Sequence, residues 1–202
     1  SPPEPWLMLA LNALGAVDRR HPADEALVRS AIDEFFSRIS RADACRALAD
    51  NAYRQYLARA GKHCFVDKTS RYWMVLDFID VLYPEAPQIV LLRNPYAIAA
   101  SLKSTWGIAL LPEGCPPAHS SHLADLVLGL PALAARRNHP NTQVVRYETL
   151  VAQPGEEIRR VVAALGYDPN GITSTTIGTT DYLKTGSFGD RKILEKNAID
   201  GR

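Results

Sequence analysis

PQIVLLRNPYAIAASL, residues Pro87–Leu102, is the stretch that decides the fold. Ile89–Leu92 is an unbroken apolar run, which is typical of a strand that a parallel sheet buries on both faces. Asn94 is a favourable N-cap residue, and Pro95 suits the first position of a helix. The stretch therefore predicts a strand that ends at Arg93 and turns directly into a helix.

This predicted turn has the outline of an anion site. A helix N-terminus presents unpaired N–H groups and the positive end of the helix dipole, and Arg93 adds a planar fork of donors suited to a phosphate. Ser101 lies eight residues after Arg93, about two turns into the helix, and is close enough to share the same anion. An arginine that pairs with a surface carboxylate explains this segment alone at least as well.

The same order of strand and helix recurs twice more along the chain. Further short strands are predicted at His63–Val66 and Thr142–Arg146, and each is followed by a helix, at Tyr72–Tyr83 and Pro154–Leu165. Polar residues follow each strand. This alternation predicts an α/β fold with a parallel sheet, whose ligands bind at the carboxyl ends of the strands.

Two amphipathic helices are predicted upstream of this alternation. The first covers about Ala23–Ile39, where apolar residues recur at helical spacing. The second ends at Gly61, a residue suited to a C-terminal cap. These helices predict a small helical subdomain over residues 23–61.

Composition excludes several classes of partner. The 23 basic and 22 acidic residues give a net charge of +1, so no global field favours nucleic acid or an anionic membrane. Cys45, Cys64 and Cys115 are far apart and lack metal-ligand spacing, which indicates a reducing compartment and predicts neither a disulfide framework nor a metal site. No apolar run reaches the roughly 18 residues of a spanning helix, and we expect a cytoplasmic protein.

Two longer stretches resemble a known family. FVDKTSRYWMVLDFIDVLYPEAPQIVLLRNPYAIAASLKSTW (Phe65–Trp106) and VVRYETLVAQPGEEIRRVVAALGY (Val144–Tyr167) are similar to sulfotransferases that use 3′-phosphoadenosine 5′-phosphosulfate (PAPS). The likeness is greatest to the bacterial branch related to tyrosylprotein sulfotransferases. It implies a P-loop-NTPase-like three-layer fold with a central parallel sheet and an attached helical subdomain.

The resemblance also implies roles for individual residues. Arg93 and Ser101 match the family residues that bind the 3′-phosphate of the nucleotide. Tyr147 matches the tyrosine that lies against the adenosine. Lys68 matches the lysine that approaches the oxygen bridging phosphate and sulfate.

Two further assignments rest on shorter matches. Glu4 resembles the glutamate that takes the proton from the acceptor hydroxyl, although an exposed acid near a chain end is the alternative reading. Lys184, Thr185 and Gly186 resemble the start of a late loop that closes over the 3′-phosphate. In that loop Arg191 stands where the family has tryptophan.

Family members also carry a strand and a phosphosulfate-binding loop before the matched glutamate, whereas only three residues precede Glu4 here. We therefore expect residues 1–202 to be a single sulfotransferase-like domain without its first strand and loop and without its C-terminal end. Residues 23–61 would be a helical insertion within it.

The resemblance implies transfer of a sulfuryl group from PAPS to a hydroxyl, with 3′,5′-ADP as the product and no metal. The acceptor stays open among small molecules, carbohydrates, lipids and peptides, and so does the oligomeric state. One alternative is a nucleotide kinase-like transferase, which would need a Walker-type loop and carboxylates for Mg²⁺. Another is a non-catalytic domain that binds a nucleotide or a protein.

Overall fold

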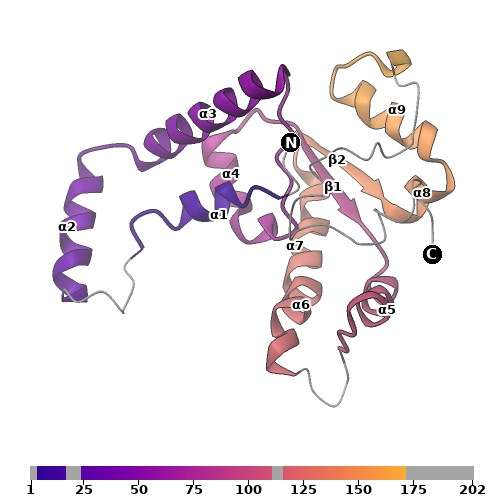
Figure 1. Ribbon diagram of the computed structural model, residues 1–202, viewed down its shortest axis with the longest axis horizontal. Coiled ribbons are helices and arrows are strands. Elements are labelled where there is room, and N and C mark those ends of the chain that lie inside the picture. The colour runs from indigo at the N-terminus through magenta and orange to yellow at the C-terminus, as the bar shows by residue number, and fades with distance from the viewer. Residues whose placement is uncertain (1–3, 17–23, 111–115, 172–202) are drawn as a thin grey trace. The chain divides into compact units, whose positions relative to one another are not determined.

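The computed structural model describes residues 4–16, 24–110 and 116–171. The chain divides into two compact units, Ser1–Glu85 and Ala86–Arg202, and each is described by itself. Figure 1 labels the main elements of both. No helix in the described ranges is both long enough and apolar enough to cross a membrane.

Every regular element described in the first unit is a helix. Its elements are α1 (Leu7–Asn12), α2 (Glu25–Ser37), α3 (Arg41–Ala60), the 3-10 helix η1 (Tyr72–Val75) and α4 (Leu76–Leu82). Local signals fix the ends of the two long helices: the side chain of Asp24 caps α2, that of Ser40 caps α3, and Gly61 ends α3 at φ 60°. The helices predicted on either side of residue 40 are confirmed.

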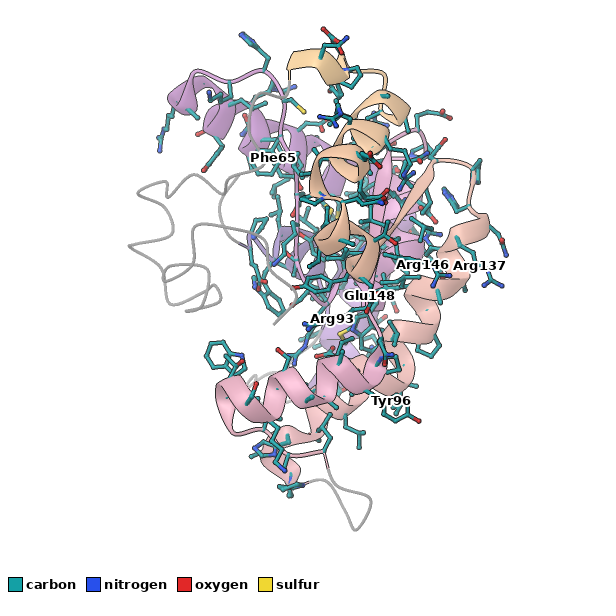
Figure 2. The ribbon with its side chains drawn as sticks, turned by 90° about the vertical axis from the view of Figure 1, so that its right-hand side faces the viewer. Phe65, Arg93, Tyr96, Arg137, Arg146 and Glu148 are labelled. Atoms are coloured by element: carbon teal, nitrogen blue, oxygen red, sulfur yellow. The ribbon has the colours of Figure 1, made fainter. Side chains whose placement is uncertain are left out.

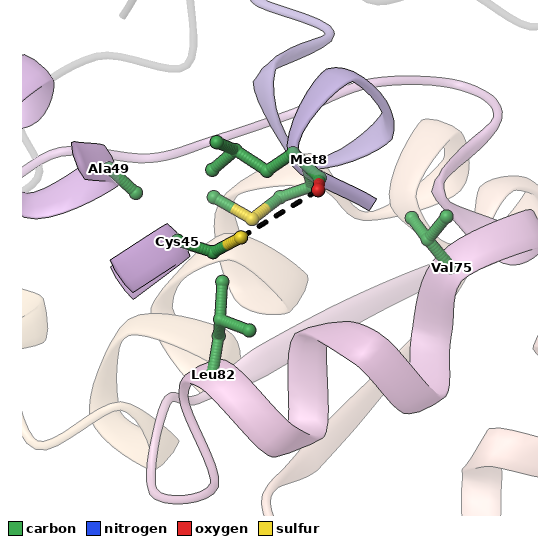
Figure 3. Close-up of a cluster of buried hydrophobic side chains, with 6 residues drawn as sticks. Met8, Cys45, Ala49, Val75 and Leu82 are labelled. Carbon is green, nitrogen blue, oxygen red and sulfur yellow. Dashed lines mark hydrogen bonds between the residues drawn. The ribbon is translucent and has the colours of Figure 1, made fainter. Parts of the chain in front are cut away.

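One core holds this unit together. Its buried members are Met8, Leu11, Cys45, Ala49, Val75 and Leu82. Figure 3 shows how these side chains from α1, α3, η1 and α4 meet, with the Cys45 thiol directed at the carbonyl oxygen of Leu11 at 3.7 Å. The core therefore anchors the short helix α1, although that helix is only 6 residues long.

The prediction of a strand over His63–Val66 is wrong, because these residues form no ladder. A strand needs a backbone partner, and local sequence cannot supply one. Here Phe65 instead packs its ring on two tyrosines of α3, with centroid distances of 4.4 Å to Tyr53 and 5.4 Å to Tyr56. The segment is an extended connection that leads to Asp67 and Lys68.

The second unit contains a parallel pair of strands with helices around it. Its elements are β1 (Gln88–Leu92), α5 (Pro95–Trp106), η2 (Pro117–His119), α6 (Ser120–Ala124), the π-helix η3 (Asp125–Gly129), α7 (Leu130–Ala135), η4 (Arg136–Asn138), β2 (Thr142–Arg146), α8 (Tyr147–Ala152), α9 (Pro154–Ala164) and η5 (Pro169–Gly171). β1 and β2 pair in parallel from Gln88 opposite Thr142 to Leu92 opposite Arg146 (Figure 1). Both strands were predicted at these places, and the α/β class is confirmed.

Burial of β1 is one-sided, which corrects the prediction of burial on both faces. Val90 is 4% exposed, whereas Ile89 and Leu91 are 49% and 50% exposed. Successive side chains of a strand point to opposite faces, so one face of β1 is covered and the other is largely open within the described residues.

Candidate active site

The carboxyl ends of the two strands bring Arg93 and Tyr147 together. The ladder ends with Leu92 opposite Arg146, so Arg93 and Tyr147 are the next residues on neighbouring strands. The Arg93 guanidinium lies over the Tyr147 ring, 4.3 Å from its centroid. Such stacking orients a guanidinium while leaving its N–H donors available at the edge.

The next pair of residues fixes the turn. The backbone N–H of Asn94 donates to the carboxylate of Glu148 at 2.9 Å, and the Asn94 side chain accepts from the N–H of Tyr96 at 2.9 Å. The hydrogen bond from the Asn94 N–H, with smaller contributions from the backbone N–H of Glu148 and from the charge of Arg93, lowers the pKa of Glu148 below its ordinary value. Figure 2 shows Arg93 and Glu148 in the same region where the strands end. The predicted cap is thus confirmed, and Glu148 ties the end of β2 to it.

Arg93 suits an anion in this setting. Among the described residues no carboxylate lies within salt-bridge distance of the Arg93 guanidinium. Ser101 is half-buried in α5, and no hydrogen bond joins its side chain to Arg93 within the described ranges. Lys184, Thr185 and Gly186 lie outside the described residues.

In the first unit the structure brings Glu4 and Lys68 together, although 64 positions separate them. The Lys68 ammonium donates to the Glu4 carboxylate at 2.6 Å. The Lys68 side chain is 63% exposed and that of Glu4 is 17% exposed. The sequence hypothesis requires this neighbourhood, since a base and a leaving-group donor must serve the same reaction centre.

A backbone contact holds the Glu4 segment beside Lys68. The N–H of Trp6 donates to the hydroxyl of Thr69 at 3.3 Å. If this segment is held against the core, its apolar side chains should be buried, but Trp6, Leu7 and Leu9 are only half-buried, and the buried anchors are Met8 and Leu11. The reason is the period of α1, which turns residues 8 and 11 to the core.

Asp67 forms a polar centre next to Lys68 that sequence reasoning missed. Its carboxylate accepts hydrogen bonds from the hydroxyls of Tyr53 and Tyr72, the latter at 2.9 and 3.0 Å. Burial raises the pKa of Asp67 despite these donors, and burial is also the main cause that raises the pKa of Tyr72 to about 12. Both tyrosines are therefore neutral donors at physiological pH.

Only the position of Asp67 beside Lys68 could have pointed to this centre from the sequence. Tyr53 fitted the apolar face of a predicted helix, and Tyr72 stood at the start of another.

The described residues contain no group of three or more His, Cys, Asp or Glu side chains that could hold a metal ion.

We compared the chain with known protein families and structures. The model of a family described as "Sulfotransferase family" matches residues 1–170. The chain belongs to the sulfotransferase family.

The chain is also similar to two individual proteins. It is 57% identical over 218 residues to "Nodulation protein NoeE" of Sinorhizobium fredii (strain NBRC 101917 / NGR234), in an alignment that covers 100% of this chain and 52% of NoeE. The chain thus spans about half the length of this curated relative. A solved "Sulfotransferase Domain from the Curacin Biosynthetic Pathway" aligns over 99% of this chain and 78% of its own, with a TM-score of 0.57 and 19% identity. That likeness shows the fold alone, the P-loop-like α/β fold of sulfotransferase domains.

Proposed function

We propose that this chain carries catalytic and nucleotide-binding residues of a sulfotransferase that moves a sulfuryl group from PAPS to a hydroxyl of an acceptor. Membership of the sulfotransferase family supports the reaction class. The observation that carries the residue assignment is the contact of 2.6 Å between Lys68 and Glu4. This contact puts a proton acceptor and a cationic donor in one place.

The proposed nucleotide-binding residues of the second unit lie at the ends of β1 and β2. Arg93 would bind the 3′-phosphate, with Ser101 from α5 as a further donor, and Tyr147 would lie against the adenosine. The stacking of Arg93 on Tyr147 supports this assignment, since it holds the guanidinium in one orientation before any ligand arrives. Lys184, Thr185 and Gly186 remain proposed contacts to the same phosphate.

The proposed catalytic roles in the first unit follow from the charges of Lys68 and Glu4. PAPS, when bound, supplies a sulfuryl group attached to an oxygen that bridges to phosphate. Lys68 would donate to that bridging oxygen and stabilise its charge as the sulfur–oxygen bond breaks. Glu4 would take the acceptor's proton as the new oxygen–sulfur bond forms. The products are the sulfated acceptor and 3′,5′-ADP, and the scheme needs no metal ion.

Three wider statements belong to the same proposal. The acceptor is a hydroxyl compound, with small molecules, carbohydrates, lipids and peptides all open. Residues 1–202 would form a single domain with residues 23–61 as a helical insertion, and the bacterial origin of the relative NoeE suits a bacterial protein. The three cysteines, far apart in the sequence and odd in number, support a cytoplasmic location.

The experiment is to follow transfer of a radiolabelled sulfuryl group from PAPS in the longest active form of the protein. Lys68→Ala should lower kcat on the order of 100- to 1000-fold, because it removes a preorganised donor to the leaving oxygen. Lys62→Ala is the matched control, since Lys62 is an exposed lysine in the same unit. Equal turnover of the two variants would remove Lys68 from the mechanism, and no transfer by the unmutated protein would refute the function.

A further inference from the structure

The hydrogen bonds around Asp67 join the two segments that carry Glu4 and Lys68. Glu4 lies just before α1, whereas Lys68 lies in the connection between α3 and η1. Lys68 is 63% exposed, and exposed ion pairs are weak, so the 2.6 Å contact alone does not explain why the two side chains stay together. Some other contact must hold these segments in register.

Tyr72 makes that connection through one oxygen atom. Its hydroxyl donates to Asp67, the residue next to Lys68, at 2.9 Å. The same hydroxyl oxygen accepts the backbone N–H of Met8 at 3.4 Å. Tyr72 is thus bonded at once to the segment that carries Lys68 and to the segment that carries Glu4.

Two neighbours reinforce the arrangement. Tyr53 of α3 donates to the same carboxylate of Asp67 and so limits its rotation. Thr69, which is 8% exposed, accepts the N–H of Trp6 at 3.3 Å. Buried polar groups that satisfy one another in this way specify a single geometry.

We propose that Tyr72 is a positioning residue that holds Glu4 and Lys68 in contact, through its bonds to Asp67 and to the backbone of Met8. Tyr72 itself need not touch the substrate. The consequence for catalysis rests on the proposed function, but the positioning of the two side chains does not.

The chain offers a matched control at Tyr83. Its hydroxyl donates to the carboxylate of Asp50 at 2.7 Å, and burial also raises its pKa above the ordinary value. Tyr83 packs against the same core as Tyr72. Within the part of the chain that the structure describes, the Tyr83 side chain makes no hydrogen bond to residues 4–12 or 67–69. Tyr83→Phe therefore removes a similar bond without loosening the Glu4 and Lys68 segments.

The test is the rate at which Lys68 is acylated by a small amine-reactive reagent, measured by mass spectrometry of the peptide that contains it. The bond between the ammonium and Glu4 must open before the amine can react. The Glu4→Gln variant gives the reference acylation rate of Lys68 when its ion pair with Glu4 is removed. Tyr72→Phe should raise the acylation rate roughly fivefold toward that of Glu4→Gln, whereas Tyr83→Phe should leave the parental rate. The buried core anchors Met8 and Leu11 are unchanged in every variant, and circular dichroism checks that each variant is folded.

A parental rate in Tyr72→Phe would overturn the proposal, and so would equal acceleration by Tyr72→Phe and Tyr83→Phe, which would indicate general loosening. Turnover is measured on the same proteins. If Tyr72 positions the two side chains for catalysis, Tyr72→Phe should lower kcat about 10- to 100-fold and leave KM for PAPS unchanged. If Lys68→Ala keeps its turnover, the proposed function fails, while the acylation rates still decide what Tyr72 does.

Discussion

At the scale of single residues, the contact between Arg93 and Tyr147 determines which substitutions should be tolerated. Arg93 is half-buried, and the aromatic ring orients the plane of its guanidinium. A lysine would keep the charge but would lose both the planar stacking and the fork of donors. Shape as well as charge should therefore matter at position 93.

Arg93→Ala should weaken binding of 3′,5′-ADP by roughly 10- to 100-fold, since a charge-assisted hydrogen bond contributes about 1.5–3 kcal/mol. Arg93→Lys should recover only a small part of this loss. Tyr147→Phe serves as the control, because the ring that stacks on Arg93 is retained. Equilibrium dialysis with labelled nucleotide measures all three, and full affinity in Arg93→Lys would show that the stacking is irrelevant.

Asp67 makes stability depend on pH in a direction that is easy to test. Burial raises its pKa above the ordinary 3.8, so the folded state binds the proton more strongly than the unfolded state. Its contribution to stability is fully present below the unfolded pKa of 3.8 and is lost as pH rises through the folded pKa. The unmutated protein should therefore lose stability relative to Asp67→Asn as pH rises from about 3 through the folded pKa of Asp67. Urea unfolding at a series of pH values measures this difference, and a constant or opposite difference would contradict the burial argument.

At the scale of elements, Arg160 attaches helix α9 to strand β2. Its guanidinium donates to the carbonyl oxygen of Val144 at 2.8 Å and to the carboxylate of Glu157 at 2.6 Å. Because Arg160 is exposed, the ion pair itself contributes little, and the bond to the strand backbone matters more. The attachment keeps α9 next to the strand that carries Tyr147 at its end.

Arg160→Ala should destabilise the protein by about 1 kcal/mol, a typical value for one lost hydrogen bond. Arg159→Ala, the neighbouring exposed arginine on the same helix, should change stability by less than about 0.5 kcal/mol. Chemical denaturation gives both values. Equal effects of the two variants would mean that the contact with Val144 does not stabilise the unit.

The successful predictions at this scale concern features that neighbouring residues determine. Caps at Asn94 and Gly61 and the apolar run of β1 depend on adjacent residues, and these predictions are confirmed. The strand at His63–Val66 failed because pairing depends on a distant partner. The tyrosine bonds to Asp67 also went unpredicted, because they join residues from three separate segments and no short motif encodes them.

At the scale of the whole molecule, the proposed residues divide between the two units. Glu4 and Lys68 belong to the first, and Arg93, Ser101 and Tyr147 belong to the second. The family match runs through both units, over residues 1–170. The resemblance could assign roles across the chain because its motifs are short, ordered segments. The assignment of Glu4 as the base also required that Glu4 lie near Lys68, and the two side chains are in contact.

The central claim is that this chain recognises the nucleotide of PAPS, and calorimetric titration with nucleotides tests it most directly. We predict that 3′,5′-ADP binds in the presence of a metal chelator. We also predict that 5′-AMP, which lacks the 3′-phosphate, binds at least about 10-fold more weakly, because the proposed contact with Arg93 requires that phosphate. ATP should show no Mg²⁺-dependent binding. Tight Mg²⁺-dependent binding of ATP, or equal affinity for 3′,5′-ADP and 5′-AMP, would contradict the account.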